Sequence, residues 1–219
     1  KATVTNLSLQ RVAGKPHMVS EYNHPAPNTH AGEGPLFLAA CAGLQDWDAL
    51  FLYTYSHEDK KTKAGLIPDF FDIGQHPTIM ANTVVASAMF RRGDVSPGKQ
   101  LLTVPLPAER EIELIASQGH AWGGLRTSSL GLDSKNALRC RTALDITANP
   151  SATEPHAEPI TAEAASDTGE LSWLFKEKDK GVLTLRAPRS KAVIGHIDGQ
   201  TINLGHGVEV TAKKTLTAW

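Results

Sequence analysis

The fold is decided by the stretch Ala49-Leu50-Phe51-Leu52-Tyr53-Thr54-Tyr55, a continuous run of apolar and aromatic residues. A run of this length without alternation predicts a strand that is covered on both faces, as in a parallel sheet. A second strand is predicted at residues 17–22, where an apolar-polar run ends at a loop with two prolines in three residues. A helix is predicted between the two strands, and this order is typical of an α/β fold.

Two apolar segments predict helices, one after each strand. Residues 33–44 are nearly all apolar or small and have an acidic, proline-containing first turn, which predicts a buried helix. The second helix is predicted to begin at Pro77 and to end at Arg91-Arg92-Gly93, because basic residues followed by glycine stop a helix. Its expected buried stripe comprises Ile79, Met80, Val84, Ala88 and either Val85 or Met89. Residues 1–95 therefore form one predicted α/β unit.

The composition changes in the second part of the chain, at residues 96–219. Short strand-like runs recur there, with turn signals between them, at residues 100–106, 112–116, 138–146, 171–175, 181–185, 192–197 and 208–216. This pattern predicts an all-β module, an antiparallel β-sandwich. Residues 149–168 are rich in proline, alanine, glutamate and threonine and predict an exposed linker or long loop. The expected fold class is thus α/β plus all-β.

The composition excludes several classes of protein. The 219 residues carry 22 basic and 23 acidic side chains, so neither nucleic acid nor a membrane surface is an expected partner. The sequence contains no run of 18 apolar residues, which is the length that a helix needs to cross a bilayer. The two cysteines, Cys41 and Cys140, are too few for a disulfide scaffold or a cysteine-based zinc module and are expected to be buried thiols. The first residues lack the pattern of a secretory signal and an initiating methionine, so we expect a mature form, a cleaved product or a fragment.

Polar and aromatic residues gather where the two predicted strands end. Loops that follow parallel strands at their carboxyl ends build the sites of βα folds. A carboxylate beside aromatic rings suits a sugar, which stacks on such rings. These residues are therefore the candidates for a carbohydrate site: Glu21, Tyr22, Asn23 and His24 after the first strand, Tyr53, Tyr55 and His57 after the second, and Trp47 before it.

These segments resemble the last two βα units of a (β/α)8-barrel glycoside hydrolase of the retaining clan that uses two catalytic glutamates. The resemblance rests on Ser20-Glu21-Tyr22-Asn23-His24-Pro25, on Glu33 and on residues 45–55. It implies that Glu21 is the nucleophile, that Glu33 is a supporting carboxylate, and that the aromatic residues near the second strand form a substrate platform. It also implies a TIM-like barrel end at residues 1–95, an appended β-sandwich, an oligosaccharide or polysaccharide substrate, and an extracellular or periplasmic location.

The sequence departs from this family at the second catalytic carboxylate. Retaining hydrolysis needs two carboxyl groups roughly 5–5.5 Å apart, and the family's acid/base glutamate usually follows an asparagine. No Asn-Glu pair occurs in this chain, and the first six barrel strands have no counterpart. The residues leave four substitute acids open: Glu33, Glu58, Asp69 and Asp72.

Two further hypotheses therefore stand beside the hydrolase. The chain could be a non-catalytic carbohydrate-binding or structural fragment, or a half-barrel completed by a missing N-terminal half or by a second copy in a homo-oligomer. The histidines lack the spacing of an HExxH or paired Cys/His site, and Asp69-x-x-Asp72 lacks the glycine of a calcium loop. We therefore expect no metal and no cofactor.

Overall fold

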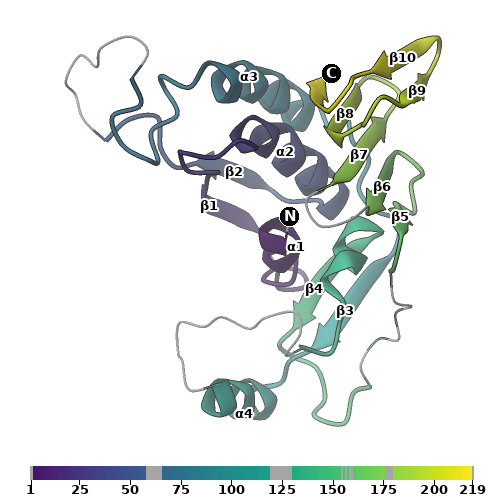
Figure 1. Ribbon diagram of the computed structural model, residues 1–219. Coiled ribbons are helices and arrows are strands. Elements are labelled where there is room, and N and C mark those ends of the chain that lie inside the picture. The colour runs from purple at the N-terminus through teal and green to yellow at the C-terminus, as the bar shows by residue number, and fades with distance from the viewer. Residues whose placement is uncertain are drawn as a thin grey trace.

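The computed structural model describes residues 2–57, 66–118, 130–153, 155, 157, 160–175 and 180–218. These residues form a mixture of helices and strands with four small sheets (Figure 1). The arrangement agrees with an α/β part followed by a β-rich part. Within the described ranges the parallel strands do not close into a barrel.

The first part has the predicted order of elements. Strand β1 (Met18–Tyr22) pairs in parallel with β2 (Ala49–Leu52). The short 3-10 helix η1 (Ala31–Glu33) and helix α2 (Gly34–Gln45) connect them, and α3 (Pro77–Arg91) packs beside α2. The predicted positions of both strands and both helices are therefore confirmed to within a few residues.

Two details predicted for this part were wrong, the end of the second strand and the buried face of the second helix. Strand β2 ends at Leu52 rather than Tyr55, and 53% of the Phe51 side chain is exposed, so the strand is not covered on both faces. In α3 the buried residues are Ile79, Asn82, Ala86 and Met89, while Val84 is 69% exposed. The buried stripe of α3 is thus rotated from the predicted one, because Asn82 turns inward and donates a hydrogen bond to the carbonyl of Gly32.

Helix α2 lies at the centre of the molecule. Pro35 occupies its first turn, and Asp46 ends it in the left-handed conformation, where its N–H donates to the carbonyls of Ala42 and Gly43. Eleven of its residues are buried. Figure 1 shows α2 between the β1–β2 pair and the strands of the second part. No helix among the described residues is long and apolar enough to span a membrane.

The second part begins with a further parallel unit, which corrects the prediction of an all-β module at residues 96–219. Strand β3 (Leu101–Pro105) pairs in parallel with β4 (Arg141–Asp145). Helix α4 (Ala108–Gln118) and the 3-10 helix η3 (Ser134–Leu138) lie between them in the chain, and η3 contacts α1 (Ala2–Ser8).

The strand predicted at residues 112–116 is part of α4 and was wrong. Pro107 precedes the helix. Glu109 and Glu111 in its first turn stabilise it, because their negative charges interact favourably with the positive end of the helix dipole. Leu114 packs against a buried cluster around Leu106, whereas Ile112 is exposed. These helix signals outweigh the short apolar run.

The remaining strands form an antiparallel sheet and a hairpin. The sheet has the order β11-β8-β7-β6-β5, and the hairpin pairs β9 with β10. The bounds are β5 Glu163–Ala165, β6 Leu171–Phe175, β7 Gly181–Arg186, β8 Lys191–His196, β9 Thr201–Gly205, β10 Val208–Thr211 and β11 Thr215–Ala218. The predicted strand at 208–216 is therefore two strands, β9 was missed, and β5 lies inside the predicted linker at 149–168.

The two parts share one hydrophobic core. Phe37 of α2 meets Trp173 of β6 edge to face, with ring centroids 4.9 Å apart. One buried cluster contains residues from α2, α3, β6, β7 and β8. Asp94 after α3 is buried and binds Arg92, Arg189 and Ser190. The predicted boundary near residue 95 is therefore crossed by continuous packing.

Candidate functional site

The side chain of Glu21 is exposed near the carboxyl end of β1. The pairing of β1 with β2 shifts register between Val19 and Tyr22, and both of these residues are buried. Ser20 and Glu21 between them are exposed. Within the described ranges Glu21 has neither a hydrogen bond nor an ion pair, so its carboxylate is available to a ligand.

Tyr22 and His24 form an inward-facing pair. The Tyr22 hydroxyl lies 2.8 Å from Nε2 of His24, and Nδ1 of His24 lies 3.4 Å from the carbonyl of His30. Burial lowers the pKa of His24 and raises the pKa of Tyr22 well above its ordinary value. A neutral His24 donates a hydrogen bond from Nδ1 to the carbonyl of His30 and accepts one from the Tyr22 hydroxyl at Nε2. These two predicted substrate contacts thus bond to each other.

Asn23 ties the end of β1 to the next strand and loop. Its Nδ2 donates to the carbonyls of Tyr53 and Phe71, at 2.6 Å each. The side-chain nitrogen of Asn23 therefore binds the main chain, and contact of this residue with substrate stays a prediction. The clamp fixes Tyr53 beside the end of β1.

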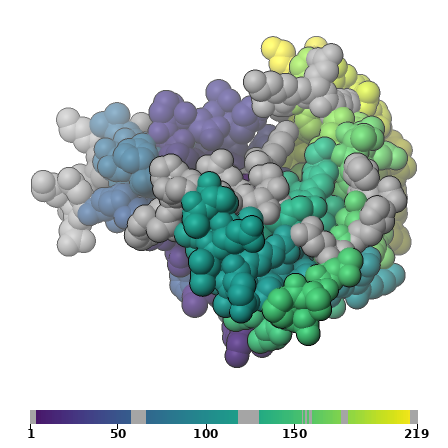
Figure 2. Space-filling model, turned by 90° about the horizontal axis from the view of Figure 1, so that it is seen from below, coloured from purple at the N-terminus to yellow at the C-terminus, as the bar shows by residue number. Residues whose placement is uncertain are grey.

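A polar cluster follows β2, and we call His57, Asp69 and Asp72 the His57 cluster. Nδ1 of His57 lies 2.7 Å from Oδ1 of Asp72 and 3.8 Å from Oδ1 of Asp69. Nε2 of His57 lies 3.2 Å from the Tyr53 hydroxyl. Asp72 is almost fully buried, and its Oδ2 has no hydrogen-bond partner among the described residues. The loop that contains Asp69 and Asp72, coloured blue, projects to one side of the molecule (Figure 2).

The hydrogen bonds of this cluster set the tautomer of His57. Nδ1–H of His57 donates a hydrogen bond to the Asp72 carboxylate, so Nε2 accepts the hydrogen bond from the Tyr53 hydroxyl. The ring of Tyr53 meets His57 and Phe71 edge to face. The arrangement can orient and polarise the Tyr53 hydroxyl at the same end of the sheet as Glu21.

The structure does not bring every predicted residue to this end. Trp47 precedes β2, at the opposite end of the strand, where it packs on His17 with ring centroids 5.1 Å apart. Only 5% of Trp47 is exposed, so its ring offers no open face to a sugar. Tyr55 does follow β2 and is 65% exposed, with the main chain of Gly74 close against its ring.

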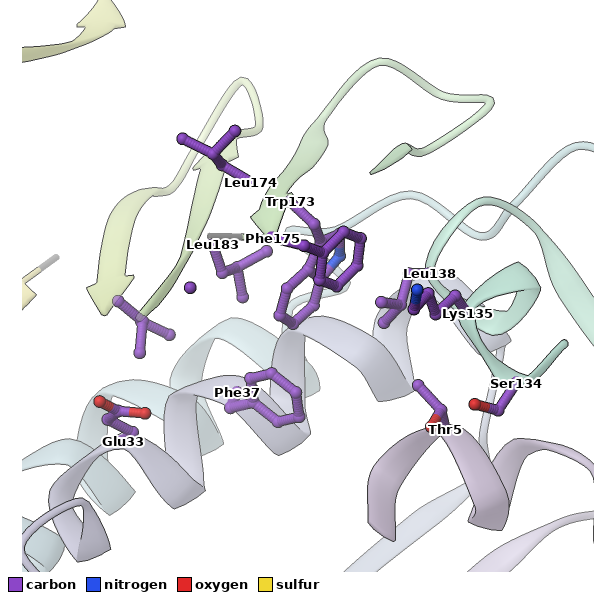
Figure 3. Close-up of a pocket in the computed structure, with 12 residues that line it drawn as sticks. Thr5, Glu33, Phe37, Ser134, Lys135, Leu138, Trp173, Leu174, Phe175 and Leu183 are labelled. Atoms are coloured by element: carbon purple, nitrogen blue, oxygen red, sulfur yellow. The ribbon is translucent and has the colours of Figure 1, made fainter. Parts of the chain in front are cut away.

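Glu33 lines a different cavity, of about 230 Å³, between α2 and the antiparallel sheet (Figure 3). Phe37 and Trp173 form its apolar wall, and Lys135 lies 5.1 Å from the centroid of the Phe175 ring. Oε1 of Glu33 pairs with Nδ1 of His30 at 3.2 Å. Glu33 therefore faces an apolar cavity that the other candidate residues do not line.

The four substitute acids separate in the same way. Glu33 belongs to the cavity of Figure 3, and Asp69 and Asp72 belong to the His57 cluster. Glu58 lies outside the described residues. The sequence did not reveal the cluster as a group, because His57 and its two aspartates are joined only by the fold of the long loop.

The two cysteines agree with the expectation of buried free thiols. Cys41 and Cys140 are both buried and unpaired with each other. Burial raises the pKa of Cys41 to about 12 and that of Cys140 to about 11, which makes both thiols poor nucleophiles. Neither thiol is therefore a candidate nucleophile.

Comparison with known proteins adds no family: no family model matches this chain, nor does any curated protein or solved structure.

Proposed function

We propose that this protein is a glycoside hydrolase, or the C-terminal part of one, that cleaves β-linked glycans with Glu21 as the nucleophile. The observation that carries the proposal is the exposed Glu21 carboxylate at the carboxyl end of β1, which has no partner among the residues that the structure describes. The exposed rings of Tyr53 and Tyr55 follow β2 at the same end of the sheet. A carboxylate acts as the nucleophile in retaining hydrolysis, and exposed aromatic rings at the same end of the sheet suit the stacking of a sugar.

The proposal also assigns the first part of the chain to the end of a (β/α)8 barrel and the second part to an appended β-sandwich. The order β1-α2-β2-α3 agrees with two consecutive units of a (β/α)8 barrel. The five-stranded sheet and the β9–β10 hairpin support a sandwich-like appendage, because Ile202 and Val210 of the hairpin pack on Val182 and Val193 of the sheet.

Glu21 would attack the anomeric carbon of the sugar, and the leaving oxygen would need a proton from a second group. Asp72 is buried and bonded to His57, so it is suited to positioning that ring rather than to touching substrate. The Tyr53 hydroxyl is exposed enough to reach a ligand and is held by Nε2 of His57. The Tyr53 hydroxyl would turn from Nε2 of His57 to give its proton to the leaving oxygen, and the phenolate would then take a proton from the water that releases the sugar from Glu21.

The test is to replace Glu21 with glutamine, which keeps the shape of the side chain and removes its charge. The rate of hydrolysis of aryl β-glycosides should fall at least about 100-fold, with an unchanged circular dichroism spectrum. Glu163→Gln is the matched control, because Glu163 is also an exposed strand glutamate but lies in β5. Hydrolysis that survives E21Q at the native rate would refute Glu21 as the nucleophile.

A second candidate function is carbohydrate binding without hydrolysis. It is favoured because, of the described candidate acids, none contacts Glu21, whereas retaining hydrolysis needs a second carboxyl group nearby. Calorimetry with oligosaccharides separates the two functions. Binding without product on prolonged incubation would support the second function over the first.

A further inference from the structure

We propose that the His57 cluster binds a divalent transition-metal ion and that Zn²⁺ is its natural occupant. His57, Asp69 and Asp72 each offer a ligand atom, and these three atoms lie within 4.8 Å of one another. The spacing of the residues along the chain predicted no metal site. The proposal rests on the geometry of the folded loop. It shares His57, Asp72 and Tyr53 with the proton donor proposed above, and a bound ion would take the place of the His57–Asp72 hydrogen bond.

The distances between the donor atoms suit a small ion. Tetrahedral zinc has bonds of about 2.0–2.2 Å to nitrogen and oxygen, which place its ligand atoms about 3.3–3.6 Å apart. The two measured separations from Nδ1 of His57, 2.7 Å to Asp72 and 3.8 Å to Asp69, lie on either side of this range. Side-chain shifts of less than about 1 Å at these two contacts, and of up to about 1.5 Å between the two carboxylates, which lie at most 4.8 Å apart, would give all three atoms coordination distances.

The burial of Asp72 is a second, independent observation. Only 2% of its side chain is exposed, and one carboxylate oxygen, Oδ2, has no partner among the described residues. A buried carboxylate oxygen without a donor is costly, and a bound cation removes that cost. The other oxygen, Oδ1, is the atom 2.7 Å from Nδ1 of His57, and it also accepts the main-chain N–H of His57 at 3.0 Å. It can keep that bond on one lone pair while it binds the ion with the other, and the charge of the ion also stabilises Oδ2 of the same carboxylate.

Each of the three ligands is also held by a hydrogen bond from outside the cluster or from the main chain. Once Nδ1 binds a metal, the ring proton moves to Nε2, which then donates to the Tyr53 oxygen 3.2 Å away. The N–H of Phe71 donates to Oδ1 of Asp69 at 3.1 Å. Metal-binding histidines and carboxylates in proteins are oriented by partners of this kind.

The ligand set favours zinc over calcium or magnesium. Imidazole nitrogen suits zinc and its neighbours among the transition metals, whereas calcium and magnesium prefer sites made of oxygen alone. The side chains of His57 and Asp69 are 34% and 41% exposed. A fourth coordination position would therefore face solvent and take water, as in zinc sites with three protein ligands.

The experiment measures metal binding by the full chain after treatment with EDTA and dialysis. Titration calorimetry should show one Zn²⁺ per chain, and Co²⁺ should give the visible absorption bands of a tetrahedral site. Zn²⁺ should raise the thermal midpoint, while Ca²⁺ and Mg²⁺ at equal concentration should not.

Variants locate the ion. H57Q and D69N should each weaken Zn²⁺ binding by more than about 100-fold, and Y53F should weaken it by about 10–100-fold. The matched control is H196Q, because among the described residues His196 pairs with a single carboxylate, that of Asp198 at 3.7 Å, and it should leave the affinity unchanged. Circular dichroism confirms that each variant is folded. Absence of bound Zn²⁺, or binding that is unaltered by both H57Q and D69N, would overturn the proposal.

Discussion

Gln45 offers a direct measure of how strongly the two parts of the chain depend on each other. Its side chain, at the end of α2, is fully buried. Nε2 donates to the carbonyls of Ala137 and Cys140 at 2.7 and 2.6 Å. Oε1 accepts the main-chain N–H of Thr142 at 2.9 Å and faces its hydroxyl at 3.4 Å. One amide thus joins α2 to η3 and β4.

Replacing Gln45 with methionine keeps the size of the side chain and removes all of these bonds. Three main-chain groups lose their partner: the carbonyls of Ala137 and Cys140 and the N–H of Thr142. Each buried polar group left without a partner costs about 1–3 kcal/mol, so the free energy of unfolding should fall by about 3–6 kcal/mol, taking the lower part of that range. For a domain of this size the thermal midpoint should fall by at least about 6 °C.

Urea unfolding followed by tryptophan fluorescence and by far-UV circular dichroism tests this estimate. The two signals should change together, because the shared core makes unfolding cooperative. Gln100→Met is the control, since Gln100 is exposed, and it should change stability by less than about 0.5 kcal/mol. A loss below about 1 kcal/mol in Q45M would show that these hydrogen bonds do not stabilise the fold as argued.

Two further predictions concern backbone strain and pH. Gly195 has φ +133, and a Cβ there would lie 2.0 Å from the Gly181 carbonyl oxygen, so G195A should lower stability by more than about 3 kcal/mol in urea unfolding. G207A, at φ +76 with open space around it, should cost about 1 kcal/mol, and equal losses in both variants would contradict the steric argument. Burial lowers the pKa of His24 below its ordinary 6.5, so its contribution to stability is fully present above about pH 6.5 and is lost as the pH falls through the native pKa. Between roughly pH 8 and pH 5 the thermal midpoint of H24Q should therefore decrease by less than that of the native protein. Equal decreases in the two proteins would refute this role of His24.

The elements of the first part could be predicted because their signals are local. Proline in the first turn marks the start of both α2 and α3, and the Pro-rich loop marks the end of β1. The buried face of α3 could not be predicted, since it depends on a distant contact from Asn82 to Gly32. Hydropathy alone placed Val84 inside, where the fold leaves it exposed.

In the candidate site, too, features set by neighbouring residues could be predicted, and features set by distant contacts could not. The position of Glu21 near the end of β1 could be predicted, because the end of a strand is marked by local features of the sequence. The burial of Tyr22 and Trp47 could not be predicted, because both residues belong to a buried cluster that distant parts of the chain build together. The His57 cluster needed the loop to fold back across 15 residues, and no spacing rule describes such a loop.

The central position of α2 also has a consequence for synthesis of the protein. The helix ends at Gln45, but the sheet that covers Phe37 is complete only at Ala218, the end of β11. At roughly 5–20 residues per second, a ribosome needs about 9–35 s to make the intervening chain. Until then α2, which has eleven residues that are buried in the folded protein, lacks part of the sheet that covers it. Efficient production should therefore depend on chaperones that shield nascent chains.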